Sequence, residues 1–446
     1  MRHILIIGAG RSASSLIKYL LEKSDSEKLH LTIGDLSLEL AQQKTKNHPN
    51  ATPIAFDINN EFQRKTEIQK TDLVISMLPA HLHIEVAKDC LVFKKHLVTA
   101  SYISDAMMEL NEDVKKNNLI FMNEIGLDPG IDHMSAMKII DKIKEQGGKI
   151  TSFESFCGGL VSPESDNNIW NYKFTWVPRN VVLAGQGGVS KFIQQGEYKY
   201  IPYQQLFLRT DILDLGIHGK FEAYANRDSL KYQHVYGLEE AKTLYRGTLR
   251  KTGFSKAWNV LVQLGMTDDS YIMDNSENMS YRDFTNSFLP FHPVNSVETK
   301  LLLNFNLNQS DDIWKKLIDL DLFNSNKIIG LKNATPAQIL QKILSESWAL
   351  SPNDKDMIVM YHRFVFEING IKKQIDSTMV CLGEDQTYTA MAKTVGLPVA
   401  MGALQILNGN IKSPGVQLPI DKNVYITILK ELESFGISFT ENKISL

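Results

Sequence analysis

Residues 3–13 read HILIIGAGRSA, a short apolar run that leads directly into a glycine-rich turn. Apolar residues then recur every three or four positions up to Leu21, the spacing of a helix that lies on a sheet. A second apolar run, 29–33, leads to Asp35. Strand, glycine turn, helix, strand and carboxylate in this order predict a dinucleotide-binding unit, because glycines let the backbone approach a pyrophosphate and the helix N-terminus offers it N–H groups.

Asp35 bears on the choice of dinucleotide. Its carboxylate lies about twenty residues beyond the glycines, where it can accept hydrogen bonds from the ribose hydroxyls of the adenosine. A carboxylate there repels a 2′-phosphate, so Asp35 favours NAD over NADP. The alternative interpretation is a surface carboxylate at the end of a strand.

Further strands extend the first unit. Strand candidates lie at 53–56, 72–77, 96–100 and 119–122, and helical segments separate most of them. This alternation predicts an α/β fold with a doubly wound parallel sheet of the Rossmann type. Ligands of such sheets bind beyond the carboxyl ends of the strands. The segments that follow the last three strands are therefore candidates for the site: 76–79, 100–102 and 123–130.

The pattern changes beyond about residue 150. Apolar strands separated by long polar loops predict a second α/β domain with a mixed sheet, and helical periodicity returns between about 255 and 350, where Thr335–Gln338 reads as a capping box. Residues 356–368 and 371–382 flank Asn369-Gly370, the signal of a tight hairpin, and 389–409 is helical again. The predicted domains are a dinucleotide-binding domain (1–125 with about 388–446), a substrate-binding domain (126–255 with about 352–387) and a mostly helical domain (256–351).

The composition is that of an ordinary globular protein with a small ligand. At 446 residues the chain exceeds one usual core, and about three folding units fit this length. Lysines and arginines are scattered and balanced by acids to a net charge of -3, which argues against nucleic acid as a partner. The first strand begins after two residues and no apolar run reaches about 18 residues, so we expect neither a signal peptide nor a membrane partner.

Cysteine usage bears on the compartment. Cys90, Cys157 and Cys381 are odd in number and far apart, and they offer neither a disulfide framework nor a cysteine-rich metal site. We therefore expect a reducing, cytoplasmic setting and no bound metal. Cys157 by itself reads as an inert small residue.

The segment 128–133, DPGIDH, has two interpretations. Asp128 could be the N-cap and Pro129 the first residue of a helix. Because the segment follows a strand of the cofactor sheet, a substrate-binding or catalytic role is the favoured interpretation. His133 could be a buried, hydrogen-bonded histidine or a proton carrier.

Arginines gather in two segments of the second domain. Residues 226–229 and 246–250 contribute Arg227, Arg246 and Arg250 to a region with few other arginines. Guanidinium groups bind carboxylates through two parallel hydrogen bonds, so this set suits an amino-acid-like substrate with several carboxylates. Taken singly, each arginine could equally be solvated or salt-bridged.

Several of these segments, in this order, resemble saccharopine dehydrogenase of the L-glutamate-forming type, also called saccharopine reductase. The matching stretches span nearly the whole chain: DLVISMLP (72–79), HLVTASYIS (96–104), MNEIGLDPGIDHM (122–134), FCGGLVSPES (156–165), YKFTW (172–176), NRDS (226–229), RGTLRKTGF (246–254) and AMAKTVGLP (390–398). The resemblance implies a Rossmann domain that regains a C-terminal helical segment, a substrate domain that supports a homodimer, and a helical third domain. It also implies reversible oxidation of saccharopine with NAD(P)+ and water to glutamate and 2-aminoadipate 6-semialdehyde, a reaction of lysine metabolism.

The resemblance also assigns residues by position. Saccharopine would contact Ser101, Tyr102, Asp128, Arg227, Thr248, Leu249 and Arg250. The dinucleotide would be lined by Gly8, Gly10, Arg11, Ser12, Asp35, Asp57, Ser76, Leu78, Ala100, Ser101 and Leu127. Asp128 and Tyr102 are the favoured residues for proton handling, with Cys157 and His133 ranked lower, and His81 and His83 read as residues of a cofactor loop.

The chain departs from its fungal NADP-using relatives at Asp35, where they place an arginine that can pair with the 2′-phosphate. This again favours NAD. Ala225 stands where the family has a proline before Asn226-Arg227-Asp228, which affects the shape of the loop at these residues. Two alternatives remain: an imine reductase like carboxynorspermidine dehydrogenase, and a non-catalytic Rossmann protein that only binds dinucleotide.

Overall fold

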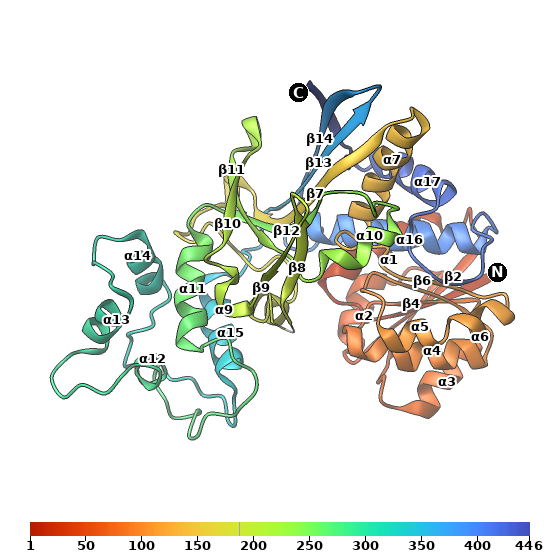
Figure 1. Ribbon diagram of the computed structural model, residues 1–446. Helices are drawn as coiled ribbons and strands as arrows, with labels where there is room; N and C mark the ends of the chain where they lie inside the picture. The colour runs from red at the N-terminus through yellow and green to blue at the C-terminus, as the bar shows by residue number, and fades with distance from the viewer. Residues whose placement is uncertain (187) are drawn as a thin grey trace. The chain divides into compact units, whose positions relative to one another are not determined.

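The computed structural model describes residues 1–186 and 188–446 (Figure 1). The chain divides into two compact units: residues 1–150 with 366–446 form the first, and residues 151–365 form the second. The N-terminal and C-terminal segments therefore fold together. The three-part division drawn from the sequence, with boundaries near 125, 255, 351 and 387, stays a prediction.

The first unit is built on a seven-stranded parallel sheet in the order β15-β6-β5-β4-β1-β2-β3. Its strands are β1 (Arg2–Ile7), β2 (Leu29–Asp35), β3 (Ala51–Ala55), β4 (Leu73–Ser76), β5 (His96–Thr99), β6 (Ile120–Met122) and β15 (Gly415–Gln417). The strand order reverses between β1 and β4, which makes the sheet doubly wound. This confirms the predicted Rossmann-type fold.

Helices cover both faces of this sheet (Figure 1). They are α1 (Ser14–Lys23), α2 (Leu38–Thr45), α3 (Glu61–Gln69), α4 (His83–Val92), α5 (Asp105–Glu109), α6 (Asn111–Lys116) and α16 (Ala390–Leu407). Two further helices of this unit, α7 (Ile131–Glu145) and α17 (Lys422–Glu433), pack against each other. Leu16, Ile17 and Leu20 of α1 are fully buried, as the predicted stripe requires. A buried cluster that includes Leu5 and Phe121 fills the space under α3, α4 and α6.

Helix α16 packs against α1 and against strands β4 and β5. By length and composition it is apolar enough to cross a membrane, but 78% of it is buried inside the protein, as in a core helix. Gly396 sets the approach of the two helices, because a Cβ there would lie 2.9 Å from the backbone nitrogen of Leu16 and 3.0 Å from the carbonyl oxygen of Ser12.

The second unit contains a mixed sheet in which β10, β11, β12, β7 and β13 are neighbours in that order. Its strands are β7 (Lys149–Val161), β8 (Ser190–Gln194), β9 (Glu197–Ile201), β10 (Thr210–Asp214), β11 (Lys220–Ala225), β12 (Thr243–Lys251) and β13 (Asp356–Ile368). Strand β12 runs parallel to β7 and antiparallel to β11.

Helices make up most of the remainder of the second unit. They are α8 (Pro178–Val182), α9 (Tyr203–Leu206), α10 (Tyr232–Val235), α11 (Phe254–Leu264), α12 (Tyr281–Ser287), α13 (Val297–Phe305), α14 (Asp312–Asp319) and α15 (Pro336–Ser347). Helix α15 begins with the predicted capping box of Thr335 and Gln338.

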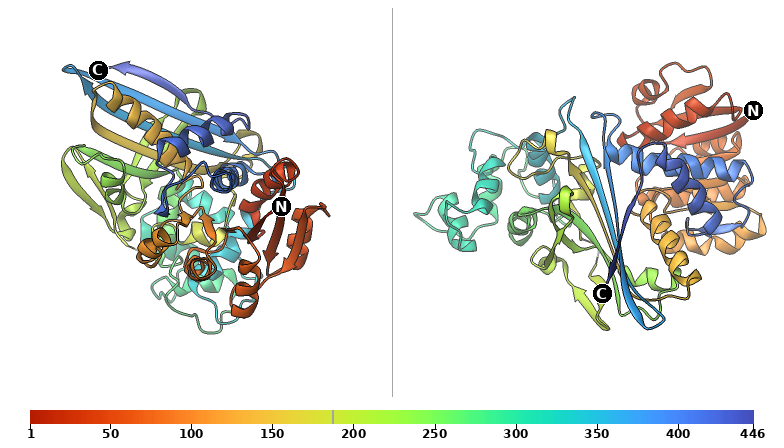
Figure 2. Two further views of the ribbon diagram at one scale, coloured as in Figure 1. Left: turned by 90° about the vertical axis from the view of Figure 1, so that its right-hand side faces the viewer. Right: turned by 90° about the horizontal axis from the view of Figure 1, so that it is seen from above.

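The predicted hairpin is confirmed with the same bounds. Strand β13 turns into β14 (Ile371–Leu382) through Asn369 and Gly370, whose φ angles of 52° and 76° a tight turn requires. Within the first unit, β14 pairs with β16 (Thr440–Ser445), and the two lie side by side in both views of Figure 2.

We predict that Gly396→Ala lowers the free energy of unfolding by about 1–3 kcal/mol, because the new methyl group meets backbone atoms that cannot move aside. Gly402→Ala, in the same helix, is the matched control: its Cβ would meet the end of the Ile125 side chain, which can rotate. Denaturant unfolding of both variants measures the difference. Equal losses would contradict the role given to Gly396.

Candidate active site

The glycine turn after β1 is shaped for close approach of a ligand. Gly8 has φ 104°, and a Cβ there would lie 3.0 Å from the carbonyl oxygen of Met77. Gly10 caps the short 3-10 turn Arg11–Ala13 without a side-chain hydrogen bond. A Cβ on Gly10 would meet nothing within 4 Å, so open space faces the start of the helical segment. These residues fit a dinucleotide pyrophosphate.

Asp35 is held beside this turn by two backbone hydrogen bonds. Its Oδ2 accepts from the backbone N–H of Ala9 at 2.8 Å, and its Oδ1 accepts from that of Ser37 at 3.0 Å. The carboxylate thus ends β2 with both oxygens oriented. Asp57, two residues beyond β3, likewise accepts from the N–H of Asn59 at 2.9 Å.

His83 joins the carboxyl ends of β4 and β5. Its Nδ1 lies 2.8 Å from the hydroxyl of Ser76, and its Nε2 lies 2.7 Å from the hydroxyl of Ser101 and 3.2 Å from that of Thr99. The side chain is buried at the first position of α4, so the expectation of a loop residue is wrong for His83. Burial, with a smaller contribution from His81, lowers the pKa of His83 to about 4.

The interpretation of Asp128 as a helix cap is wrong. Helix α7 begins at Ile131 with Gly130 as its N-cap, and the carboxylate of Asp132 accepts from the N–H of Gly130 at 2.6 Å. Gly130 lies so close to Gly126 that a Cβ would be 2.1 Å from its carbonyl oxygen, so the loop folds back on itself before the helix starts.

The side chain of Asp128 forms a hydrogen bond with Tyr102 and does not cap a helix. The phenol of Tyr102 donates to Asp128 Oδ1 at 3.0 Å. The two residues favoured for proton handling therefore lie in direct contact, beyond β5 and β6.

Glu124 and His133 form a buried pair in the same region. His133 is fully buried, with Nε2 3.0 Å from Glu124 Oε2. The other oxygen of Glu124 accepts from the N–H of Ile103 at 2.9 Å, which ties α7 to the loop that carries Tyr102. Glu124, two residues beyond β6, lies in the candidate segment 123–130 but was not singled out from the sequence as a site residue.

In the second unit, Arg250 is buried among aromatic rings. Its guanidinium carbon lies 5.1, 5.7 and 5.5 Å from the ring centres of Tyr172, Tyr224 and Phe254. One nitrogen donates to the carbonyl of Leu249 at 2.8 Å, whereas Nε has no hydrogen-bond partner in the described part of the chain. No carboxylate of residues 1–186 or 188–446 forms an ion pair with it. A buried cation in this state needs an anion, which a bound ligand can supply.

The other substrate residues predicted in this unit lie on β12 with Arg250 or directly beyond β11. Thr248 faces Cys157 in the register of β12 and β7, and Leu249 is fully buried. Arg246 stacks 4.4 Å from the ring centre of Tyr232. Arg227 has a left-handed backbone with φ 47°, and its carbonyl accepts from Lys191.

Two features of this region escaped the sequence reasoning. Tyr172 and Tyr224 form the walls around Arg250, and the buried Lys173 pairs with Asp354 at 2.6 Å. The polar and aromatic alternation of 172–176 was the available signal. The pair fixes the segment that carries Tyr172.

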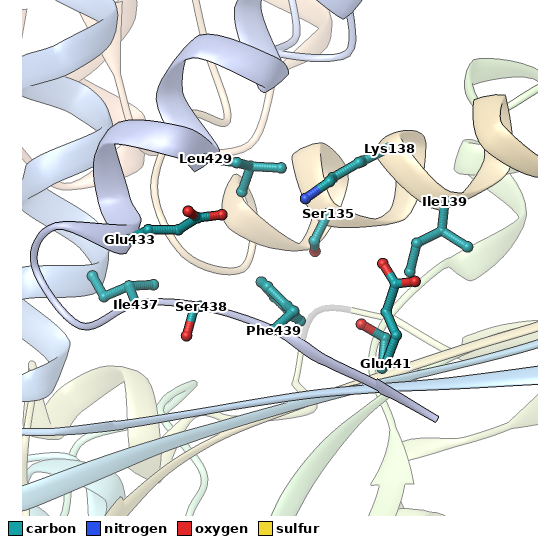
Figure 3. A pocket seen from close by; sticks show the side chains of 10 residues that line it. Ser135, Lys138, Ile139, Leu429, Glu433, Ile437, Ser438, Phe439 and Glu441 are labelled. Atoms are coloured by element: carbon teal, nitrogen blue, oxygen red, sulfur yellow. The ribbon is translucent and has the colours of Figure 1, made fainter. Parts of the chain in front are cut away.

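The described residues form a further small pocket but no metal-binding cluster. Among residues 1–186 and 188–446, no group of three or more His, Cys, Asp or Glu side chains is arranged to hold a metal ion. A small pocket of about 40 Å³ lies between α7, α17 and the start of β16, with Lys138, Glu433 and Glu441 on its walls (Figure 3). None of the sequence-predicted site residues lines it.

The lowered pKa of His83 predicts a pH-dependent stability. The unfolded state binds the proton near pH 6.5 but the folded state only near pH 4, so the stability is present above about pH 6.5 and is lost as the pH falls between these values. Between about pH 7 and pH 4, wild type should lose ~3 kcal/mol more than His83→Gln, which cannot titrate. Denaturant unfolding across this range measures it, and parallel pH profiles would contradict it.

Comparison with known proteins agrees with this arrangement. Residues 4–122 match the family described as "Saccharopine dehydrogenase NADP binding domain", and residues 126–437 match "Saccharopine dehydrogenase C-terminal domain". A Schizosaccharomyces pombe protein named saccharopine dehydrogenase [NADP(+), L-glutamate-forming] is 32% identical over 99% of both chains. The mitochondrial alpha-aminoadipic semialdehyde synthase of Bos taurus is 32% identical over 98% of this chain and 47% of its own.

The fold agrees as well. The apo structure of saccharopine dehydrogenase (L-Glu forming) from Saccharomyces cerevisiae superposes with a TM-score of 0.88 at 32% identity and covers 100% of both chains. The chain belongs to the saccharopine dehydrogenase family.

Proposed function

We propose that this protein reversibly oxidises L-saccharopine with a nicotinamide dinucleotide and water to L-glutamate and 2-aminoadipate 6-semialdehyde. Family membership and the names of the full-length fungal relatives support this activity. The observation that carries it in this chain is the buried guanidinium of Arg250 without a carboxylate partner in the described residues. Saccharopine carries three carboxylates and can supply the missing anion.

The chemistry divides into oxidation and hydrolysis. A bound nicotinamide would supply the acceptor for the hydride that leaves the carbon beside the secondary amine, on the lysine-derived side of saccharopine. The resulting imine takes up water, and the carbinolamine collapses to the aldehyde and glutamate. The carboxylate of Asp128 can accept a proton from the amine or the attacking water, and the phenol of Tyr102 orients it through their 3.0 Å hydrogen bond.

The same proposal assigns the cofactor. Gly8, Gly10 and the N-terminal residues of the helical segment would hold the pyrophosphate, and Asp35 would accept from the adenosine ribose. The family and the fungal relatives are named for NADP. We nevertheless propose NAD for this chain, because the carboxylate of Asp35 is fixed at the turn by Ala9 and would repel a 2′-phosphate.

We also propose that the protein acts as a cytoplasmic homodimer with no nucleic-acid or membrane partner. Light scattering at micromolar concentration tests the dimer. A mass of one chain would contradict it.

Steady-state kinetics with saccharopine should give a higher specificity constant with NAD than with NADP. Asp35→Arg should reverse the preference, because the guanidinium can pair with the 2′-phosphate in place of a repulsive carboxylate. A wild-type preference for NADP would overturn the cofactor proposal. Turnover of carboxynorspermidine in place of saccharopine would overturn the substrate.

Arg250→Met and Asp128→Asn should each lower kcat/KM for saccharopine by about 100-fold or more, since each removes a charge that meets the substrate. Lys256→Met is the control: it removes an exposed cation from the same unit and should leave kcat/KM unchanged. Wild-type kinetics in either of the first two variants would contradict the site.

A further inference from the structure

His83 lies outside the residues that the proposed reaction uses, yet its ring holds three hydroxyls at the carboxyl ends of two neighbouring strands. Ser76 and Thr99 are the last residues of β4 and β5, and Ser101 follows β5. Ser76, Thr99 and the ring of His83 are buried, whereas Ser101 is half-buried. The ring therefore connects the interior of the sheet to the one hydroxyl of the group that reaches solvent.

The geometry favours one of the two neutral tautomers of His83. Two hydroxyl oxygens, those of Ser101 at 2.7 Å and Thr99 at 3.2 Å, gather around Nε2. One N–H can be shared between two oxygens, whereas one lone pair cannot accept from two donors. This arrangement favours Nε2 as the donor and Nδ1, which lies 2.8 Å from the hydroxyl oxygen of Ser76, as the acceptor.

This arrangement sets the direction of the Ser101 hydroxyl. Because its oxygen already accepts from His83, its own proton is directed to another acceptor. Charging the ring would remove the acceptor on Nδ1, and burial together with the neighbouring His81 opposes charging, as the pKa of about 4 indicates. At neutral pH the ring thus stays uncharged, with Nε2 as its donor and Nδ1 as its acceptor.

We propose that His83 is a positioning residue that makes Ser101 a hydrogen-bond donor to a carboxylate of the substrate. The proposal rests on the proposed function for the identity of the ligand. The tautomer of His83 does not depend on it, so the two can fail separately.

Two substitutions at His83 separate the two ends of the ring. The amide of asparagine reaches the position of Nδ1 and can keep the bond to Ser76, whereas that of glutamine reaches the position of Nε2 and can keep the bond to Ser101. His83→Asn should raise KM for saccharopine about tenfold with a smaller change in kcat, as Ser101→Ala should. His83→Gln should recover most of that loss.

The double variant His83→Asn/Ser101→Ala should be no worse than the poorer single variant, since both changes remove the same interaction. Thermal unfolding near pH 7 checks that all variants are folded. Equal effects of asparagine and glutamine, or losses that multiply in the double variant, would overturn the proposal.

A spectroscopic test does not require turnover. Nitrogen–proton correlation spectra of protein with 15N-labelled histidine report the tautomer of each of the 11 rings, and comparison with His83→Gln assigns His83. A neutral ring with the proton on Nε2 near pH 7 is expected. A proton on Nδ1, or a charged ring, would overturn the proposal even if saccharopine is turned over. If wild type does not act on saccharopine, the proposed function fails while the spectrum still decides the tautomer.

Discussion

The parallel sheet of the first unit places the carboxyl ends of its strands at one edge, and the candidate site depends on this constraint. Side chains far apart in sequence meet there only because the strands run in one direction. His83 reaches Ser76 seven residues back and Ser101 eighteen residues on. Asp35 reaches the turn after β1 across 26 residues. At the turn after β1, Gly10 carries no side chain, so the space in front of this edge stays open.

In the second unit the determining interaction is the buried charge of Arg250. Aromatic faces attract a cation but do not complete its hydrogen bonds, so the guanidinium is stabilised while Nε keeps a donor without a partner. The ion pair between Lys173 and Asp354 fixes the neighbouring segment that carries Tyr172. Such a group is costly unless a ligand completes it, and this favours a binding role over a purely structural one.

Much of the fold could be predicted from the sequence because its signals are local. The strands β1 to β6 of the first sheet, the capping box at Thr335 and the hairpin at Asn369-Gly370 each depend on neighbouring residues, and the structure confirms them. The seventh strand of that sheet, β15, was not predicted. The cap at Asp128 was wrong because an aspartate before a proline imitates a helix start. The contact between Gly126 and Gly130 that delays the helix is invisible to a local pattern.

The candidate site could be predicted only in part. The grouping of arginines predicts a site for a substrate with several carboxylates, and this stays a prediction. The rings around Arg250 come from three separate segments, which spacing does not show. The role of His83 likewise follows from partners on two strands, and spacing alone placed it on a loop.

In the proposed reaction, saccharopine is oxidised at the carbon on the lysine-derived side of its secondary amine. Chromatographic quantification of the products distinguishes this carbon from the one on the glutamate side. We expect glutamate and 2-aminoadipate 6-semialdehyde in equal amounts, matched by the dinucleotide reduced. Release of lysine and 2-oxoglutarate, which requires the hydride to leave the other carbon beside the amine, would contradict the account, as would the absence of turnover.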